Sequence, residues 1–185
     1  MTLVQTKTFI EDLLVIEPKV HFDKRGYFFE SFNHKEFNEL IGADVNFVQD
    51  NQSSSDYGTI RGLHYQSEKA AQGKLVQVIE GEIFDVAVDI RKNSETFGKW
   101  VGVILNEQNN NLFWIPEGFA HGFYVLSKSA KVFYHLTNYY NPEEEHCIKW
   151  NDEDLNINWP SKENPIVSEK DQRGKKFKES VYFNN

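Results

Sequence analysis

Two histidines and a lysine stand out in this sequence because their types and spacing could support chemistry. His64 closes the segment RGLH at residues 61–64, His121 closes the segment PEGFAH at residues 116–121, and Lys74 stands between them. An imidazole titrates near neutral pH, so it takes up and releases a proton under physiological conditions. These residues predict a site that moves protons.

The spacing around His64 resembles the first motif of cupins, which are β-barrel proteins with a metal site. In that motif a glycine precedes a His-x-His pair by five residues, and a glutamate and a second glycine follow. Here five residues separate Gly58 from His64, and Gln66 replaces the second histidine. Lys74 stands where the glutamate would be, and six residues separate it from Gly81. The motif is therefore present with two of its metal ligands replaced.

The second cupin motif, Pro-x-Gly-x-x-His followed by asparagine, matches Pro116, Gly118 and His121, and Val125 replaces the asparagine. A divalent metal prefers imidazole and carboxylate ligands, whereas the ammonium of Lys74 has no lone pair and repels a cation. We therefore expect a β-barrel site of acid–base groups with no metal and no cofactor. The alternative is that the two histidines only make hydrogen bonds inside the barrel.

Length and composition place the chain among globular proteins. We expect one cupin-type domain over residues 1–185, because a chain of this size buries a sufficient core. Aromatic residues make up 15%, which suits a β-rich fold or a pocket that stacks a planar ring. The net charge is −8 and no basic stripe is present, which argues against nucleic acid as a partner.

Cysteine content and hydropathy bear on the compartment. The single Cys147 excludes an intrachain disulfide and fits a reducing cytoplasm, and no catalytic motif surrounds it. Residues 1–9 lack the apolar core of a signal peptide, and no segment approaches the length that spans a membrane. We therefore expect a cytoplasmic protein with no membrane partner.

Most of the chain alternates with a period of two, which is typical of strands. Three pairs of such segments predict β-hairpins: residues 75–79 with 83–88, 100–105 with 112–115, and 123–126 with 130–136. Residues 34–40 predict a helix that stops at Gly42. The polar tail from residue 150 is expected to wrap the barrel and to end in a mobile segment. The predicted fold is mainly β, a cupin or jelly-roll barrel with a few short helices.

Segments along nearly the whole chain resemble the dTDP-4-dehydrorhamnose 3,5-epimerase family, a group of cupins without a metal. The resemblance rests on several motifs in the order in which the family has them, so it is far more specific than one cupin motif. The matching segments are residues 23–30, 48–53, 60–66, 73–76, 85–89, 114–123, 137–140 and 168–171.

The resemblance implies an isomerase of nucleotide-sugar and polysaccharide biosynthesis, in the route to dTDP-L-rhamnose. Members of the family invert C3 and C5 of dTDP-4-keto-6-deoxy-glucose, the two carbons beside its C4 ketone. A base removes a proton from each carbon, a nearby group stabilises the enolate, and an acid returns a proton to the opposite face. This chemistry requires neither a redox cofactor nor a metal.

The same resemblance implies catalytic roles for four residues. His64 is the base, and Asp171 matches the aspartate that orients it and stabilises the imidazolium. Lys74 holds positive charge near the O4 enolate, and His121 is a substrate-binding group at the same oxygen. Tyr134 matches the family's acid, although a tyrosine among the apolar residues of its strand is also compatible with core packing.

Further positions match the family's contacts with the nucleotide and its pyrophosphate. Arg61 and Arg25 are expected at the phosphates, because a guanidinium pairs well with phosphate oxygens. The remaining substrate-binding candidates match positions that line the nucleotide and sugar pocket, and they are Phe28, Glu30, Gln49, Asn51 and Tyr140. For each of these residues taken alone, packing in a strand or exposure in a turn is also a plausible explanation. Arg91 is assigned no role.

The resemblance also implies a homodimer in which N-terminal strands cross between subunits. This exchange would place Arg25, Phe28 and Glu30 in the active site of the partner, whereas the residues alone show only that segment 8–16 is apolar enough to pair. Three other functions stay open: a 3-epimerase acting at one carbon, a 3,4-ketoisomerase that moves the carbonyl, and a non-catalytic cupin that binds a sugar nucleotide. A base, a cation and a phenol together favour the epimerases.

Overall fold

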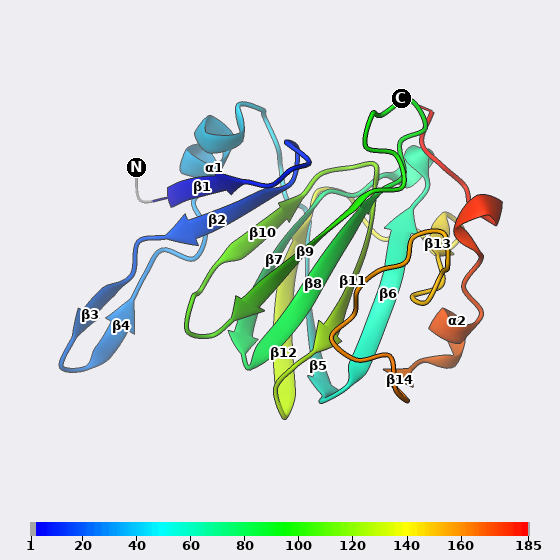
Figure 1. Cartoon of the computed structure of the whole chain (residues 1–185). Coiled ribbons are helices and arrows are strands. Elements are labelled where there is room, and N and C mark those ends of the chain that lie inside the picture. Colours follow the sequence, from blue (N-terminus) through cyan, green and yellow to red (C-terminus); the bar gives the residue numbers. More distant parts are fainter. Residues whose placement is uncertain (1–2, 185) are drawn as a thin grey trace.

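Two β-sheets face each other in the computed structural model, which describes residues 3–184 (Figure 1). The first sheet has the strand order β1 (Leu3–Lys7), β2 (Leu14–Pro18), β10 (Leu112–Ile115), β7 (Lys74–Glu80), β12 (Ser129–Leu136) and β5 (Gln49–Asp56). The second sheet runs β13 (Glu145–Cys147), β6 (Thr59–Gln66), β11 (Phe119–Val125), β8 (Glu82–Asp89) and β9 (Trp100–Asn106), and β14 (Ile166–Val167) pairs in parallel with β6. This architecture is a jelly roll, and it confirms the predicted fold class.

Smaller elements surround the two sheets. β3 (His21–Asp23) and β4 (Gly26–Phe28) form a hairpin that projects from the body of the protein (Figure 1). The helices are α1 (His34–Ile41) and α2 (Glu169–Gln172), and single turns of 3₁₀ helix lie at η1 (Glu68–Ala70) and η2 (Phe177–Glu179). None of the helices formed by residues 3–184 is long and apolar enough to cross a membrane.

The main core lies between the two sheets. Val76 and Phe113 of the first sheet pack in one buried cluster with Ile83 and Phe123 of the second. Their strands alternate, so every second side chain points into this space. Burying a side chain of this kind contributes about 1.5–3 kcal/mol to stability, and the shared core therefore holds the two sheets together.

The C-terminal tail covers the outer face of the second sheet. Trp159 and Phe177 pack there with Ile60 of β6 in a second buried cluster. The prediction that the tail wraps the barrel is thus confirmed. The expectation of a mobile end is wrong as far as residue 184, because Phe183 is buried and its amide donates a hydrogen bond to the Ile90 oxygen at 3.0 Å.

Helix α1 covers the outer face of the first sheet. Its N-cap is Asn33, whose side chain accepts a hydrogen bond from the Glu36 amide. Its C-cap is Gly42 in the left-handed conformation, and the one fully buried side chain, Phe37, packs against Trp114 of β10. The helix predicted over residues 34–40 is confirmed with one further residue, Ile41.

The three predicted hairpins are wrong, because the members of each pair lie in different sheets. Segment 75–79 lies in β7, which pairs with β10 and β12, whereas segment 83–88 lies in β8, which pairs with β9 and β11. The other two predicted pairs are also separated, because β9 and β11 belong to the second sheet whereas β10 and β12 belong to the first. Alternation identifies a strand but not its partner.

Gly81 makes the first of these crossings between sheets possible. It has φ +84°, which an L side chain rarely adopts, and a Cβ there would lie 2.1 Å from the backbone oxygen of Ser129. The residues around Gly81 therefore form the bend at which the chain passes from β7 in the first sheet to β8 in the second.

Candidate active site

Strands from both sheets bring the predicted base and its neighbours together. On the second sheet, His64 of β6 lies opposite His121 of β11 in the antiparallel register. Lys74 begins β7 on the facing sheet, and its Nζ donates a hydrogen bond to the His64 backbone oxygen at 3.3 Å. The three residues therefore meet at one place between the sheets.

A cavity of about 150 Å³ lies at this place. His64 and Lys74 line it together with Tyr134, which belongs to β12 of the first sheet. Asn51 of β5 lies opposite Tyr134 in the register of the two strands, and it lines the same cavity together with Tyr140. The structure thus brings together five residues that the sequence predicts as site residues.

His64 is held by an aspartate from α2. Nε2 of His64 lies 2.5 Å from Oδ1 of Asp171, and Oδ2 of this buried carboxylate accepts a hydrogen bond from the Gly62 amide at 3.2 Å. Burial raises the pKa of Asp171, but the hydrogen bonds from His64, Gly62 and Ser168 lower it by more, so the pKa lies below its usual range. Asp171 is therefore ionised, and it holds the imidazole with the proton on Nε2.

A glycine is required two residues before His64. Gly62 has φ +120°, and a Cβ there would lie 2.6 Å from the His121 backbone oxygen and from the Gly122 Cα. Only glycine allows β6 to approach β11 so closely. The same backbone conformation presents the Gly62 amide to Asp171.

Burial controls the charges of Lys74 and His121. It lowers the pKa of Lys74 to about 8, although Asp85 and Glu145 act in the opposite direction. His121 is also buried, and its Nε2 lies 2.8 Å from Oδ1 of Asp85, which is fully buried. Burial lowers the pKa of His121 in spite of this carboxylate. At neutral pH Lys74 therefore lines the cavity as an ammonium, whereas His121, which does not line the cavity itself, is a neutral imidazole.

The residues at the cupin metal position do not fit a divalent metal. Lys74 places a buried ammonium where an acidic ligand would be, and Gln66 offers only an amide that is already bonded to the Asn141 backbone. Nε2 of His121 is directed at Asp85. This donor set favours proton transfer over metal binding.

Polar contacts connect the wall of the cavity to the catalytic candidates. Gln49 donates to Asn51 Oδ1 at 3.0 Å and accepts from the Tyr140 amide at 3.0 Å. The Tyr140 hydroxyl donates to Glu145 at 2.6 Å, and Glu145 also forms an ion pair with Lys170 beside Asp171. These contacts fix the side chains predicted to line the nucleotide and sugar pocket.

A second, more open cavity of about 500 Å³ meets the first at His64. Arg61 and Lys170 lie in its wall, and both carry positive charge. Nε of Arg61 donates to Ser55 Oγ at 2.9 Å. An anionic group bound next to His64 would therefore meet two cations.

Three predicted site residues lie elsewhere within this chain. Arg25 belongs to the β3–β4 segment and pairs with Asp23 at 2.6 Å. Phe28, at the end of β4, is 72% exposed, and Glu30 accepts a hydrogen bond from Asn33. None of them lines either cavity around His64. Their place in a partner's site stays a prediction.

Four groups beside the cavity were not predicted as site residues from the sequence. Asp85 is a buried carboxylate with apolar residues on both sides of it in β8, a pattern that could have indicated it. Glu145 begins the short strand β13 and Lys170 lies in the short helix α2, and charged residues are ordinary in such short surface elements. Cys147 has its Sγ 3.8 Å from Oδ1 of Asp171, and burial raises its pKa to about 12. Its thiol is therefore protonated and is not an activated nucleophile.

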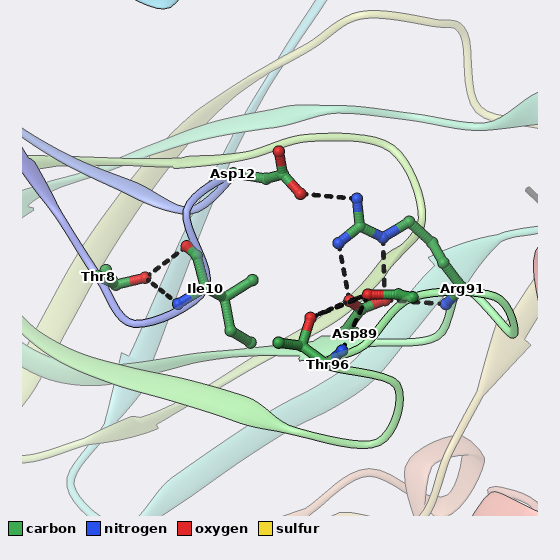
Figure 2. A network of polar contacts seen from close by, with 7 residues as sticks. Thr8, Ile10, Asp12, Asp89, Arg91 and Thr96 are labelled. Atoms are coloured by element: carbon green, nitrogen blue, oxygen red, sulfur yellow. Dashed lines mark hydrogen bonds and ion pairs between the residues drawn. The ribbon is translucent and has the colours of Figure 1, made fainter.

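Arg91 has a structural role. It forms two hydrogen bonds with the carboxylate of Asp89, at 3.0 and 2.7 Å, and a third at 2.8 Å with Asp12, as Figure 2 shows. Its guanidinium also lies over the ring of Phe119. Ser94 and Thr96 bond to the same Asp89 oxygen at 2.6 Å. The network ties the β1–β2 loop to the end of β8.

The jelly roll and its cavity define a cupin-type protein in which acid–base groups occupy the positions of metal ligands. The family model described as dTDP-4-dehydrorhamnose 3,5-epimerase matches residues 7–179. The chain belongs to this family, and it is therefore an isomerase that acts as a carbohydrate epimerase.

Individual relatives agree with this assignment. The dTDP-4-dehydrorhamnose 3,5-epimerase of Shigella flexneri is 56% identical over 177 residues, which cover 96% of this chain and 97% of the relative. A crystal structure of the dTDP-6-deoxy-D-glucose-3,5-epimerase from Legionella pneumophila, in complex with dTDP-4-keto-L-rhamnose, is 50% identical. It superposes with a TM-score of 0.95 and covers 99% of this chain and 98% of its own.

A relative with a different specificity is more distant. The 3'-monoepimerase from Streptomyces bikiniensis, in complex with dTDP-quinovose, is 31% identical with a TM-score of 0.88, and the match covers 93% of this chain and 87% of that one. The fold is therefore shared between double and single epimerases, and the higher identity falls on the double epimerases.

Proposed function

We propose that this chain inverts C3 and C5 of dTDP-4-keto-6-deoxy-glucose, with the residues around His64 as its catalytic groups. One observation carries the assignment: His64, which is held by Asp171, lines the same cavity as the buried Lys74 and Tyr134. These groups supply the base, the cation and the acid that an epimerisation next to a ketone requires.

His64 acts as the base. Its Nε2 is held by Asp171, so Nδ1, which has no hydrogen bond to residues 3–184, is the nitrogen that accepts the proton from C3 or C5. Asp171 then stabilises the imidazolium that forms, because it is buried and already ionised. The hydrogen bond from the Gly62 amide keeps the carboxylate in place.

Lys74 and His121 stabilise the enolate. Removal of the proton moves negative charge onto the C4 oxygen, and a fixed ammonium in a buried site lowers the energy of that charge. Neutral His121, whose Nε2–H is directed at Asp85, keeps the lone pair of Nδ1, and it accepts a hydrogen bond from the same oxygen once that oxygen carries a proton.

Tyr134 returns the proton. It belongs to the first sheet, whereas His64 belongs to the second, so the two side chains approach the cavity from opposite walls. A base and an acid on opposite faces of the sugar ring are what an inversion needs, and this placement supports the role of Tyr134 over simple core packing.

Arg61 and Lys170 bind the pyrophosphate in the adjoining cavity. Asn51 and Tyr140 in the wall of the smaller cavity, with Gln49 hydrogen-bonded to both, contact the nucleotide and sugar. The bound dTDP sugar in the Legionella structure supports this class of substrate.

The chain acts as a homodimer in the cytoplasm, with Arg25, Phe28 and Glu30 completing the partner's site. The exposure of the aromatic rings on the β3–β4 hairpin supports this assembly. A Phe28 ring that is 72% exposed costs hydrophobic free energy unless another surface covers it.

The test is an exchange experiment. The protein is mixed with dTDP-4-keto-6-deoxy-glucose in deuterated water, and deuterium at each carbon is measured by NMR and mass spectrometry. We expect label at both C3 and C5. Label confined to C3 would establish a 3-epimerase, movement of the carbonyl would establish a ketoisomerase, and no label would leave a binding protein.

A further inference from the structure

A histidine, a cysteine and an aspartate that are far apart in the sequence converge beside the cavity. One ring nitrogen of His64, Sγ of Cys147 and a carboxylate oxygen of Asp171 all lie within 4.8 Å of one another, and His64 Nε2 and Cys147 Sγ lie 2.5 and 3.8 Å from Asp171 Oδ1. This grouping differs from the cupin metal position, because it includes neither Gln66 nor Lys74. No spacing in the sequence predicts it.

Regular structure builds this grouping. Leu63 and Ile148 exchange two backbone hydrogen bonds, at 3.1 and 2.9 Å. The next pair in the β6–β13 register, His64 and Cys147, is therefore of the type without hydrogen bonds, in which side chains lie closest. Helix α2 then places Asp171 against both side chains. The three groups are thus held by two strands and a helix.

The three donors have the chemistry of a zinc site with an open position. Zinc prefers thiolate, imidazole and carboxylate ligands at about 2.0–2.3 Å, and three protein ligands leave a fourth position for water. Ligand atoms around such an ion lie roughly 3.5 Å apart, so His64 Nε2 and Asp171 Oδ1, now at 2.5 Å, must separate by roughly 1 Å. A thiolate and a carboxylate also balance the charge of the ion.

We propose that His64, Cys147 and Asp171 form a binding site for a thiophilic divalent cation such as Zn²⁺, and that the bound ion inhibits the enzyme. The side chain of His64 is 32% exposed and lines the open cavity, so an ion in solvent reaches the site. The inhibition rests on the proposed function of His64 as the base, whereas the binding rests only on the geometry.

The proton balance explains the inhibition. Zinc bonds to the Nε2 lone pair, so the proton that Nε2 shares with Asp171 moves to Nδ1, and the thiol of Cys147 releases its proton to solvent. Nδ1 is the nitrogen assigned to the substrate. Once it carries a proton it cannot take another, and the base is blocked without any damage to the fold.

The experiment measures binding and inhibition separately, with zinc chloride and cobalt chloride as probes. Zinc binding to the substrate-free protein is followed by calorimetry, and the cobalt form is examined for a thiolate-to-cobalt charge-transfer band. We expect one zinc per chain and a clear cobalt band. Cys147→Ala should weaken zinc binding at least tenfold and abolish the band.

Exchange activity of the wild type and of each variant is then measured with and without zinc. Inhibition is the ratio of these two activities for the same protein. Zinc should inhibit the wild type at least tenfold more strongly than Cys147→Ala, and a chelator should reverse it. His34→Ala, which removes an exposed histidine on α1, is the control and should behave as wild type.

Absence of the cobalt band, or equal zinc inhibition of wild type and Cys147→Ala, would overturn the proposal. The second result would indicate that zinc acts on a surface site or on the pyrophosphate of the substrate. The cobalt spectrum does not depend on catalytic activity. A protein that shows the band but has no epimerase activity would therefore refute the proposed function and still support the metal site.

Discussion

Replacement of Lys74 by methionine should stabilise the fold at neutral pH while it removes a charge needed for catalysis. Lys74 is buried, and burial lowers its pKa from 10.5 to about 8. One pKa unit corresponds to about 1.4 kcal/mol, so keeping this lysine charged in the folded chain costs about 3 kcal/mol relative to the unfolded chain. Methionine has a similar length and avoids that cost, so we expect the free energy of unfolding to rise by about 3 kcal/mol at pH 7.

The stability gained by Lys74→Met relative to the wild type should decrease as the pH rises. Below pH 8 Lys74 carries its proton in both the folded and the unfolded chain, so the whole cost applies. Between pH 8 and 10.5 the folded chain releases the proton first, and the unfolded chain then binds more protons. Stability of the wild type therefore rises with pH over this interval relative to Lys74→Met. Above it the lysine is neutral in both states, and the advantage of methionine disappears.

Urea denaturation of the wild type and Lys74→Met, followed by tryptophan fluorescence at pH 7 and at pH 10, measures this difference. Lys162→Met is the matched control, because Lys162 is exposed and has no ion pair with residues 3–184. Exchange activity of Lys74→Met should fall on the order of 10²–10³-fold through the lost enolate stabilisation. A Lys74→Met chain less stable than wild type at pH 7 would refute the reasoning, since the contacts with Asp85 and Glu145 would then outweigh desolvation.

Three further predictions follow from the proposed site. His64→Ala should abolish deuterium exchange at both carbons, whereas Tyr134→Phe should impair inversion more than exchange, with losses on the order of 10²–10⁴-fold; equal loss of exchange in both variants would contradict the assigned roles. Exhaustive chelation should leave full activity, and recovery of lost activity on adding a divalent ion would show that a metal takes part. Mixed dimers of Arg25→Ala and His64→Ala chains should regain one competent site, and confirmed heterodimers without activity would mean that each subunit builds its site alone.

The fold class could be predicted from the sequence, but the pairing of its strands could not. Alternation along residues 75–79 and 83–88 reports that both segments are strands with a buried face, and both are. It carries no information on whether the chain reverses within one sheet or crosses to the other. That choice depends on Gly81 and on the backbone of a strand distant in sequence, which only the folded chain brings together.

Part of the candidate site could likewise be predicted from the sequence, and part of it could not. The spacing of His64, Lys74 and His121 was informative because these residues belong to the two cupin motifs and lie on neighbouring or facing strands. Asp171 was reachable only through the family resemblance, because a charged residue in a polar tail has no local signal. The contact of Cys147 with Asp171 was not predicted at all, since it depends on a strand register and a helix position that no short pattern encodes.

The pairing of strands that are distant in sequence has a consequence for how the chain folds. β5 pairs with β12, so residues 49–56 must find residues 129–136 before the first sheet closes at that edge. Chains dominated by such non-local pairings fold slowly, in milliseconds to seconds, because loop closure precedes the gain from contacts. Asn51 and Tyr134 face each other in this late pair. In refolding, epimerase activity should therefore return with the slowest phase, after most of the circular dichroism signal of the strands has recovered.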